Sequence, residues 1–152
     1  MSPIRVDFYL LESIQADAKW LIACRLLEKA YLKGHKVYVH CSKKEEAEYL
    51  DELLWTFKDD SFIPHNLQGE GPAYPPPIQL GFAHEPKGFN DILMNLSQEL
   101  PPFFSRFKRV MEIVSNIETE KQNSRTLYKL YRSRGCDLHT HAINLPELSR
   151  SN

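Results

Sequence analysis

The sequence has few cysteines and no long apolar run, and each shortage excludes a class of protein. Only three cysteines occur among 152 residues. Cys24, Cys41 and Cys136 are widely spaced, and no two of them form a C-x-x-C pair. This pattern indicates neither a disulfide framework nor a zinc site. No apolar run approaches the ~18 residues of a membrane-spanning helix, so we expect a cytoplasmic protein without direct membrane contact.

Glycine is also scarce where a nucleotide site would need it. In open α/β sheets, phosphates bind where the first strand meets its helix, at glycines that let backbone amides approach the anion. Here residues 11–17 form that junction, and they contain the carboxylates of Glu12 and Asp17 but no glycine. Gly69–Pro72 follows no predicted strand, so we interpret it as a turn. The sequence predicts no phosphate-binding glycine loop and no cofactor.

Catalytic and metal-binding patterns are weak. His40 and Cys41 are neighbours on a predicted strand, where adjacent side chains point to opposite faces and cannot form a thiol–imidazole pair. His139 and His141 could share one face of a strand, but no third metal ligand has a matching spacing. The acidic residues lie mostly on predicted exposed helix faces and in turns. We expect no catalytic site and no metal site.

The charge is nearly balanced overall but uneven along the chain. The formal net charge is -1, and 42% of the residues are hydrophobic, which is typical of an ordinary globular protein. Residues 41–60 contain three Lys and seven Asp or Glu, whereas residues 103–134 contain eight Lys or Arg and three Glu. The length favours a single domain over residues 1–152, with a poorly ordered tail at about 144–152.

Predicted strands alternate with predicted helices. Short runs of β-branched and aromatic residues predict strands, and apolar residues spaced by three and four positions predict helices. Gly34 and Gly135 are helix stops, and Ser42 with Glu45 forms a capping box. Because a parallel neighbour requires a crossover helix, this order predicts an α/β fold with a largely parallel central sheet. The predicted strands are 4–11, 36–41, 78–82, 92–96 (or a turn), 111–114 and 136–143, the helices are 16–33, 42–55, 102–107 and 118–134, and 56–77 is a long ordered loop.

A basic stripe with an aromatic at its centre follows the last predicted helix. Arg125, Tyr128, Lys129 and Arg132 fall at i, i+3, i+4 and i+7 and share one side of the helix. Such a stripe suits an acidic ligand that ends in a hydrophobic group. A solvated helix face with one amphipathic tyrosine fits the spacing equally well. The opposite, apolar side that would dock on the sheet consists of Leu127, Leu130 and Tyr131.

A second cluster of apolar and rigid side chains begins at the end of the helix predicted over 42–55. It consists of Trp55, Phe57, Phe62, Ile63 and Pro64. Large aromatics in an irregular segment either cover the core or form a contact patch for a partner protein. Base rates of burial favour the first interpretation.

Several spaced blocks resemble the chi subunit of bacterial DNA polymerase III holoenzyme, over about Val6 to Leu138. The resemblance implies a Rossmann-like three-layer α/β/α sandwich without catalytic activity. It further implies an adaptor in the clamp-loader complex with two partners, the psi subunit and the acidic, hydrophobic-ended C-terminal tail of single-stranded DNA-binding protein (SSB). Nucleic acid would be reached mainly through these partners. The blocks are residues 8–11, 50–55, 61–67, 69–72, 91–93 and 125–132 followed by Gly135; the implied tail-binding residues are Arg125, Tyr128, Lys129 and Arg132, and the implied psi-binding residues are Trp55, Phe62, Pro64 and His65.

Two other functions remain open at this point. Direct binding of single-stranded DNA would use the basic stripe together with several exposed aromatics in a basic groove, but the stripe has one aromatic. A nucleotide- or phosphate-using enzyme would need glycines that the first strand–helix junction lacks.

Overall fold

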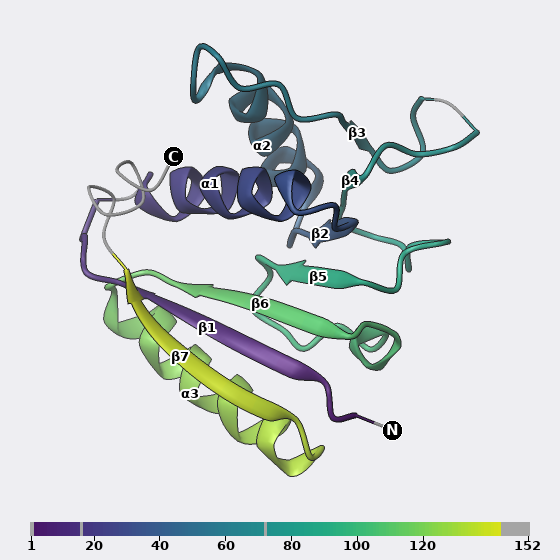
Figure 1. Ribbon diagram of the computed structural model, residues 1–152. Coiled ribbons are helices and arrows are strands. Elements are labelled where there is room, and N and C mark those ends of the chain that lie inside the picture. The colour runs from purple at the N-terminus through teal and green to yellow at the C-terminus, as the bar shows by residue number, and fades with distance from the viewer. Residues whose placement is uncertain (1, 16, 72, 144–152) are drawn as a thin grey trace.

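A seven-stranded, fully parallel sheet runs through the centre of the protein (Figure 1). The computed structural model describes residues 2–15, 17–71 and 73–143; the tail expected at 144–152 lies outside them. The strand order is β3-β4-β2-β5-β6-β1-β7, so β3 and β7 are the two edges. The strands are β1 (Arg5–Leu11), β2 (Val37–His40), β3 (His65–Leu67), β4 (Ile78–Gly81), β5 (Ile92–Asn95), β6 (Arg109–Val114) and β7 (Asp137–Ile143); the helices are α1 (Ala18–Leu32), α2 (Lys44–Thr56), α3 (Glu118–Ser133) and the short 3₁₀ helix η1 (Phe104–Arg106).

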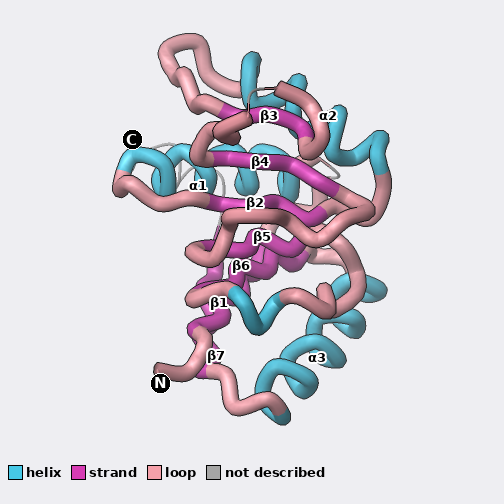
Figure 2. The backbone as a smooth tube through the Cα atoms, turned by 90° about the vertical axis from the view of Figure 1, so that its right-hand side faces the viewer, coloured by secondary structure: helices cyan, strands magenta, loops and turns pink. Residues whose placement is uncertain are grey.

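Helices cover both faces of the sheet, which confirms the three-layer α/β/α prediction (Figure 2). Successive side chains of a strand point to opposite faces, and two hydrophobic cores result. Tyr9 and Val39 belong to the core beneath α1 and α2. Phe8 and Tyr38, their neighbours in sequence, belong to the core beneath α3 and η1. α2 packs on β3 and β4, whereas α3 packs on β6 and β7, so the two helices serve opposite ends of the sheet.

The helix ends largely match the predictions. Gly34 and Gly135 adopt positive φ angles of 85° and 79° just after α1 and α3, a conformation that glycine adopts without steric cost. The predicted capping box is wrong. α2 begins at Lys44, one residue later than the box requires, and its N-cap residue Lys43 makes no side-chain cap. Instead, the carboxylate of Glu46 accepts a hydrogen bond of 3.0 Å from the backbone N–H of Ser42.

The segment predicted as one long loop contains an edge strand. β3 pairs with β4 in parallel, with His65 opposite Ile78 and Leu67 opposite Leu80. The sequence of β3, His-Asn-Leu, contains no apolar run that could mark it as a strand. In the structure all three residues are only partly buried. The conformation of β3 comes from pairing with β4, thirteen positions further along the chain, which local sequence does not reveal.

Candidate functional site

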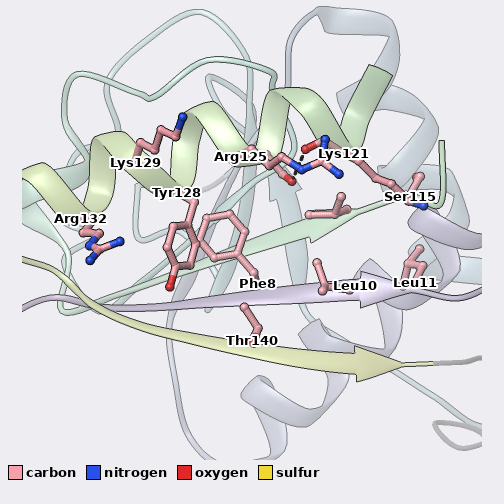
Figure 3. Close-up of a pocket in the computed structure, with 12 residues that line it drawn as sticks. Phe8, Leu10, Leu11, Ser115, Lys121, Arg125, Tyr128, Lys129, Arg132 and Thr140 are labelled. Carbon is pink, nitrogen blue, oxygen red and sulfur yellow. Dashed lines mark hydrogen bonds between the residues drawn. The ribbon is translucent and has the colours of Figure 1, made fainter. Parts of the chain in front are cut away.

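A groove lies between α3 and the sheet edge formed by β1 and β7 (Figure 3). Its volume is about 450 Å³. The strands supply an apolar floor, and α3 supplies basic and polar side chains along one wall. All four residues predicted as the basic stripe line this groove. The full lining is Phe8, Leu10, Leu11, Val114, Ser115, Lys121, Ser124, Arg125, Tyr128, Lys129, Arg132 and Thr140.

The wall is held in place by the buried side of α3. Leu127 and Tyr131 are 4% and 0% exposed. The Tyr131 ring packs edge-on against Phe8 and Phe104, with ring centroids 6.0 and 5.5 Å away, a favourable arrangement for aromatic pairs. Leu130 was predicted to dock beside them but is exposed, because the helix touches the sheet along a narrower stripe than the spacing suggested.

Tyr128 forms the middle of the wall and is half-buried. Its ring packs on Phe8 of β1, with centroids 5.5 Å apart. Arg125, Lys129 and Arg132 are exposed around it. The Nη1 atom of Arg125 lies 3.6 Å from Glu118 Oε1, but both side chains are about two-thirds exposed, and ion pairs of this kind contribute little. The groove therefore combines an apolar floor, one aromatic wall and accessible cations.

Sequence reasoning predicted four of the twelve lining residues and missed eight, among them Lys121 and Thr140. Lys121 lies four residues before Arg125 and extends the same helical stripe, so its spacing was a usable signal. Thr140 lies on β7 and reaches the groove because β7 pairs with β1, which places it opposite Phe8. No periodicity along the chain indicates that neighbourhood.

A second surface lies at the opposite end of the sheet, where α2 leads into β3. Trp55 and Phe62 are 52% and 67% exposed, and their ring centroids are 5.8 Å apart. Ile63 is buried and Phe57 packs partly against the core. The interpretation of this cluster as a core cover is therefore correct for Ile63 and Phe57 and wrong for the exposed pair. We call Trp55 and Phe62 the aromatic surface.

His65 supports the aromatic surface from beneath. Its imidazole has no exposed area, and its ring centroid lies 4.7 Å from that of Trp55. Nδ1 lies 2.6 Å from the Ile63 carbonyl oxygen, and Nε2 lies 3.1 Å from the Asp51 carbonyl oxygen. The imidazole thus ties the first residue of β3 to α2. Pro64, which lies between Ile63 and His65 in the sequence, is partly buried.

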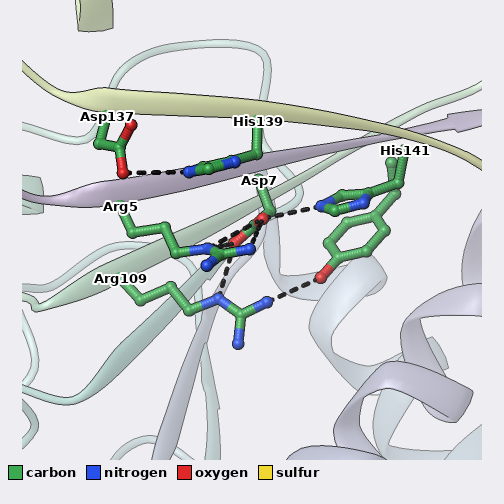
Figure 4. A network of polar contacts seen from close by, with 7 residues as sticks. Arg5, Asp7, Arg109, Asp137, His139 and His141 are labelled. Carbon is green, nitrogen blue, oxygen red and sulfur yellow. Dashed lines mark hydrogen bonds and ion pairs between the residues drawn. The ribbon is translucent and has the colours of Figure 1, made fainter.

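The two histidines of β7 have different partners: His141 joins a polar network around Asp7, whereas His139 lies 3.0 Å from Asp137 of the same strand (Figure 4). The fully buried carboxylate of Asp7 lies 2.8 Å from His141 Nε2 and accepts a hydrogen bond of 2.7 Å from Arg109. Burial opposes ionisation of Asp7, but hydrogen bonds from Arg5, His141 and Arg109 outweigh it and lower the pKa to about 2. The network joins three neighbouring strands, β6, β1 and β7.

The fold also separates His40 from Cys41, the candidate thiol–imidazole pair. The His40 ring packs against Phe103, with centroids 5.3 Å apart, whereas Cys41 is buried in the core beneath α1 and α2. They therefore point to opposite faces, as predicted. Across residues 2–15, 17–71 and 73–143, no group of three or more His, Cys, Asp or Glu is placed to hold a metal ion. Within the same residues, no helix has the length and apolarity to cross a membrane.

Comparisons with known proteins point in one direction. The family model described as DNA polymerase III chi subunit, HolC, matches residues 4–139. Relatives named DNA polymerase III subunit chi include that of Pseudomonas aeruginosa, 38% identical, with 91% of this chain and 96% of the relative covered. Those of Haemophilus influenzae and Escherichia coli are 34% and 32% identical, covering 90% and 88% of this chain and 96% and 94% of the relative.

Proposed function

Because the chain belongs to the DNA polymerase III chi subunit family, with its accessory role in replication, we propose that it is a non-catalytic adaptor between two partners. The α3 groove binds the acidic C-terminal tail of SSB, and the aromatic surface binds a psi-like subunit of the clamp loader. The observation that carries this proposal is the α3 groove, where accessible cations surround a half-buried tyrosine above an apolar floor.

The chemistry of the groove suits a peptide that is acidic and ends in a hydrophobic side chain. Guanidinium and ammonium groups form charge-assisted hydrogen bonds with carboxylates. Arg125 and Lys129 would pair with tail carboxylates, including the terminal one, and Arg132 extends the positive wall. Tyr128 would enclose the last hydrophobic side chain, with the exposed Leu10 on the floor beneath it. Because the cations are exposed, this affinity should weaken as salt rises.

The aromatic surface has the features of a protein contact. Exposed large aromatics are the residues that most often dominate binding energy in interfaces. Trp55 and Phe62 are both more than half exposed, and His65 fixes Trp55 from beneath. In this arrangement Trp55 and Phe62 contact the psi-like partner with help from Pro64, while His65 acts as a positioning residue.

The positions of the two sites fit a bridging role. The aromatic surface lies beside β3 and the groove lies beside β7, and these strands are the opposite edges of the sheet. Two partners could therefore bind at once without contacting each other. An adaptor needs this separation, whereas a single-site binding module does not.

A titration with an SSB tail peptide tests the groove. We expect Arg125→Ala and Lys129→Ala each to weaken binding at least tenfold, a loss of about 1.4 kcal/mol. The affinity that each variant retains should depend less on salt than the affinity of the wild type does. Lys33→Ala, which removes an exposed cation just after α1, is the matched control and should bind as the wild type does. Equal affinities for all four proteins would refute the proposal.

Co-purification with a psi subunit tests the aromatic surface. We expect Trp55→Ala and Phe62→Ala to abolish association while leaving the free energy of unfolding nearly unchanged, because both side chains are exposed. Binding of a single-stranded oligonucleotide to the isolated chain would instead favour the rival function. That function needs several exposed aromatics in a basic groove, and among the described lining residues Phe8 is buried and only Tyr128 is an accessible aromatic.

A further inference from the structure

The aromatic surface is bordered by carboxylates, and we infer that it selects a partner segment whose apolar contact residue is flanked by lysine or arginine. This inference rests on the proposed function and adds the chemistry of the psi-like partner. The two sites of the protein would then have opposite charge and would take partners of opposite charge.

The carboxylates share one side of α2 with Trp55. Glu48, Asp51, Glu52 and Trp55 stand at i, i+3, i+4 and i+7, the spacing that places residues on one stripe of a helix. On α3 the corresponding four positions are occupied by Arg125, Tyr128, Lys129 and Arg132. Each stripe thus joins an aromatic to charges of a single sign, negative on α2 and positive on α3.

Asp51 links this group of carboxylates to the ring that supports the aromatic surface. Asp51 Oδ1 lies 3.3 Å from the Nε2 atom of His65, the ring that supports Trp55. Burial raises the pKa of Asp51; the charge of His65 opposes this rise, and the negative charges of Glu70, Glu52 and Glu48 add to it. Four carboxylates from α2 and the turn after β3 therefore interact beside the aromatic surface.

Among the described residues, ion pairs do not neutralise the exposed members of this group. Glu48, Glu52 and Glu70 are exposed, and none of them forms an ion pair with another described residue. Lys58, which follows Trp55 in the sequence, lies 3.5 Å from Glu28 and 3.9 Å from Asp60. Its charge is therefore already shared by two carboxylates. Like charges gathered at an apolar patch repel one another until a partner supplies cations.

The same carboxylates would keep the wrong partner away. An acidic peptide suited to the α3 groove would meet repulsion at the aromatic surface, although the exposed rings there could accept its hydrophobic end. Discrimination by unfavourable charge is a common way to separate partners that share an apolar feature. The aromatic surface would thus remain available to a basic segment while the groove holds an acidic one.

Binding of a psi subunit to charge variants tests the inference. The double variant Glu48→Gln/Glu52→Gln removes two exposed charges without changing the aromatic rings. We expect about tenfold weaker psi binding at low salt and a flatter salt dependence, with unchanged affinity for the SSB tail peptide. Glu12→Gln, an exposed carboxylate on the loop after β1, is the control and should leave both affinities unchanged.

The outcomes separate this inference from the proposed function. If the wild type binds psi and the double variant binds with the same affinity and salt dependence, the charge selection is refuted and the adaptor function stands. If Trp55→Ala has no effect on psi binding, both are refuted.

A second measurement does not depend on psi. Two synthetic peptides each contain one tryptophan, which lysines flank in one peptide and glutamates flank in the other. Each peptide is titrated against the wild-type chain. We expect the lysine-flanked peptide to shift the indole N–H signal of Trp55 at a tenfold lower concentration. Equal responses to the two peptides would overturn the inference.

Discussion

The hydroxyl of Tyr131 on α3 donates a 2.5 Å hydrogen bond to the carboxylate of Glu112 on β6. Asn95 of β5 donates to the same oxygen at 2.8 Å, and all three side chains are buried. Tyr131 follows Tyr128 by three residues and immediately precedes Arg132. This bond therefore fastens to the sheet the helix that carries the basic wall of the groove.

Glu112 should make the stability of the protein depend on pH. Burial raises the pKa of Glu112 from 4.5 to about 7, so the folded state holds this proton more tightly than the unfolded chain does. The favourable contribution is complete below about pH 4.5 and is lost as the pH rises to about 7. We expect the contribution of Glu112 to the free energy of unfolding to fall by about 3 kcal/mol over this range, measured by urea denaturation as the difference between the wild type and Glu112→Gln.

The control for Glu112 is an exposed carboxylate. Glu112→Gln should remove this component of the pH dependence, whereas Glu118→Gln should keep it. Asp7 does not interfere, because its pKa of about 2 confines its effect to pH values below about 4. The same pH profile for wild type and Glu112→Gln would contradict the assignment.

Gly81→Ala should destabilise the protein by about 2 kcal/mol through overpacking. A Cβ at Gly81 would overlap the hydroxyl of Tyr38 and lie 2.5 Å from the Oε1 atom of Gln68. Tyr38 is fully buried and its hydroxyl bonds to Gln68 and to the His84 carbonyl, so it has little freedom to move. Thermal and urea denaturation measure the loss. The double variant with Tyr38→Phe should cost less than the two single changes together, and strict additivity would argue against the clash.

Lys121→Ala should weaken binding of the SSB tail peptide by about two- to fivefold, with a reduced salt dependence. Lys121 lines the groove one turn before Arg125, so it extends the positive wall toward the start of α3. Gln122→Ala alters the next, exposed residue of the helix and should bind as the wild type does. Isothermal titration at two salt concentrations measures both effects, and a loss that is the same at both concentrations would mean that charge is not the cause.

His65→Ala should weaken psi binding about tenfold while leaving binding of the tail peptide unchanged. The change removes the ring beneath Trp55 and leaves the carbonyl oxygens of Ile63 and Asp51 without their contacts. His65→Gln can restore one donor and should recover part of the affinity. The indole N–H signal of Trp55 should shift in both variants. Full psi affinity in His65→Ala would show that the ring does not position Trp55.

Local patterns in the sequence predicted most of the helices and strands. α1 and α3 follow from apolar residues at three- and four-residue spacing and from the glycines that end them. The errors occur where local signals are weak. β3 lies in the segment predicted as a loop, and the start of α2 is one residue later than the Ser42–Glu45 pattern indicated. Pairing with the distant β4 sets β3, whereas at the start of α2 another local contact, from the Ser42 backbone to Glu46, takes the place of the predicted box.

The candidate sites, too, were predicted from the sequence only in the parts that depend on local spacing. The spacing of Arg125, Tyr128, Lys129 and Arg132 was visible in the sequence, and all four line one groove. Whether a groove existed beside them depended on Phe8 and Thr140, which strand pairing brings together. The burial of the His65 ring could not be inferred from spacing either, because its contacts come from α2 and from the turn before β3.

By itself, the sequence determined the alternation of helices and strands, the glycine-free first junction and the charged stripes on α2 and α3. These properties depend on residues within two or three helical turns of one another, where periodicity fixes the geometry. Only the tertiary structure decided that β3 and β7 form opposite edges, that Trp55 and Phe62 remain exposed, and that an apolar floor lies beneath the basic wall. Those properties depend on strand pairing between residues far apart in the chain, whose order and register no local pattern encodes.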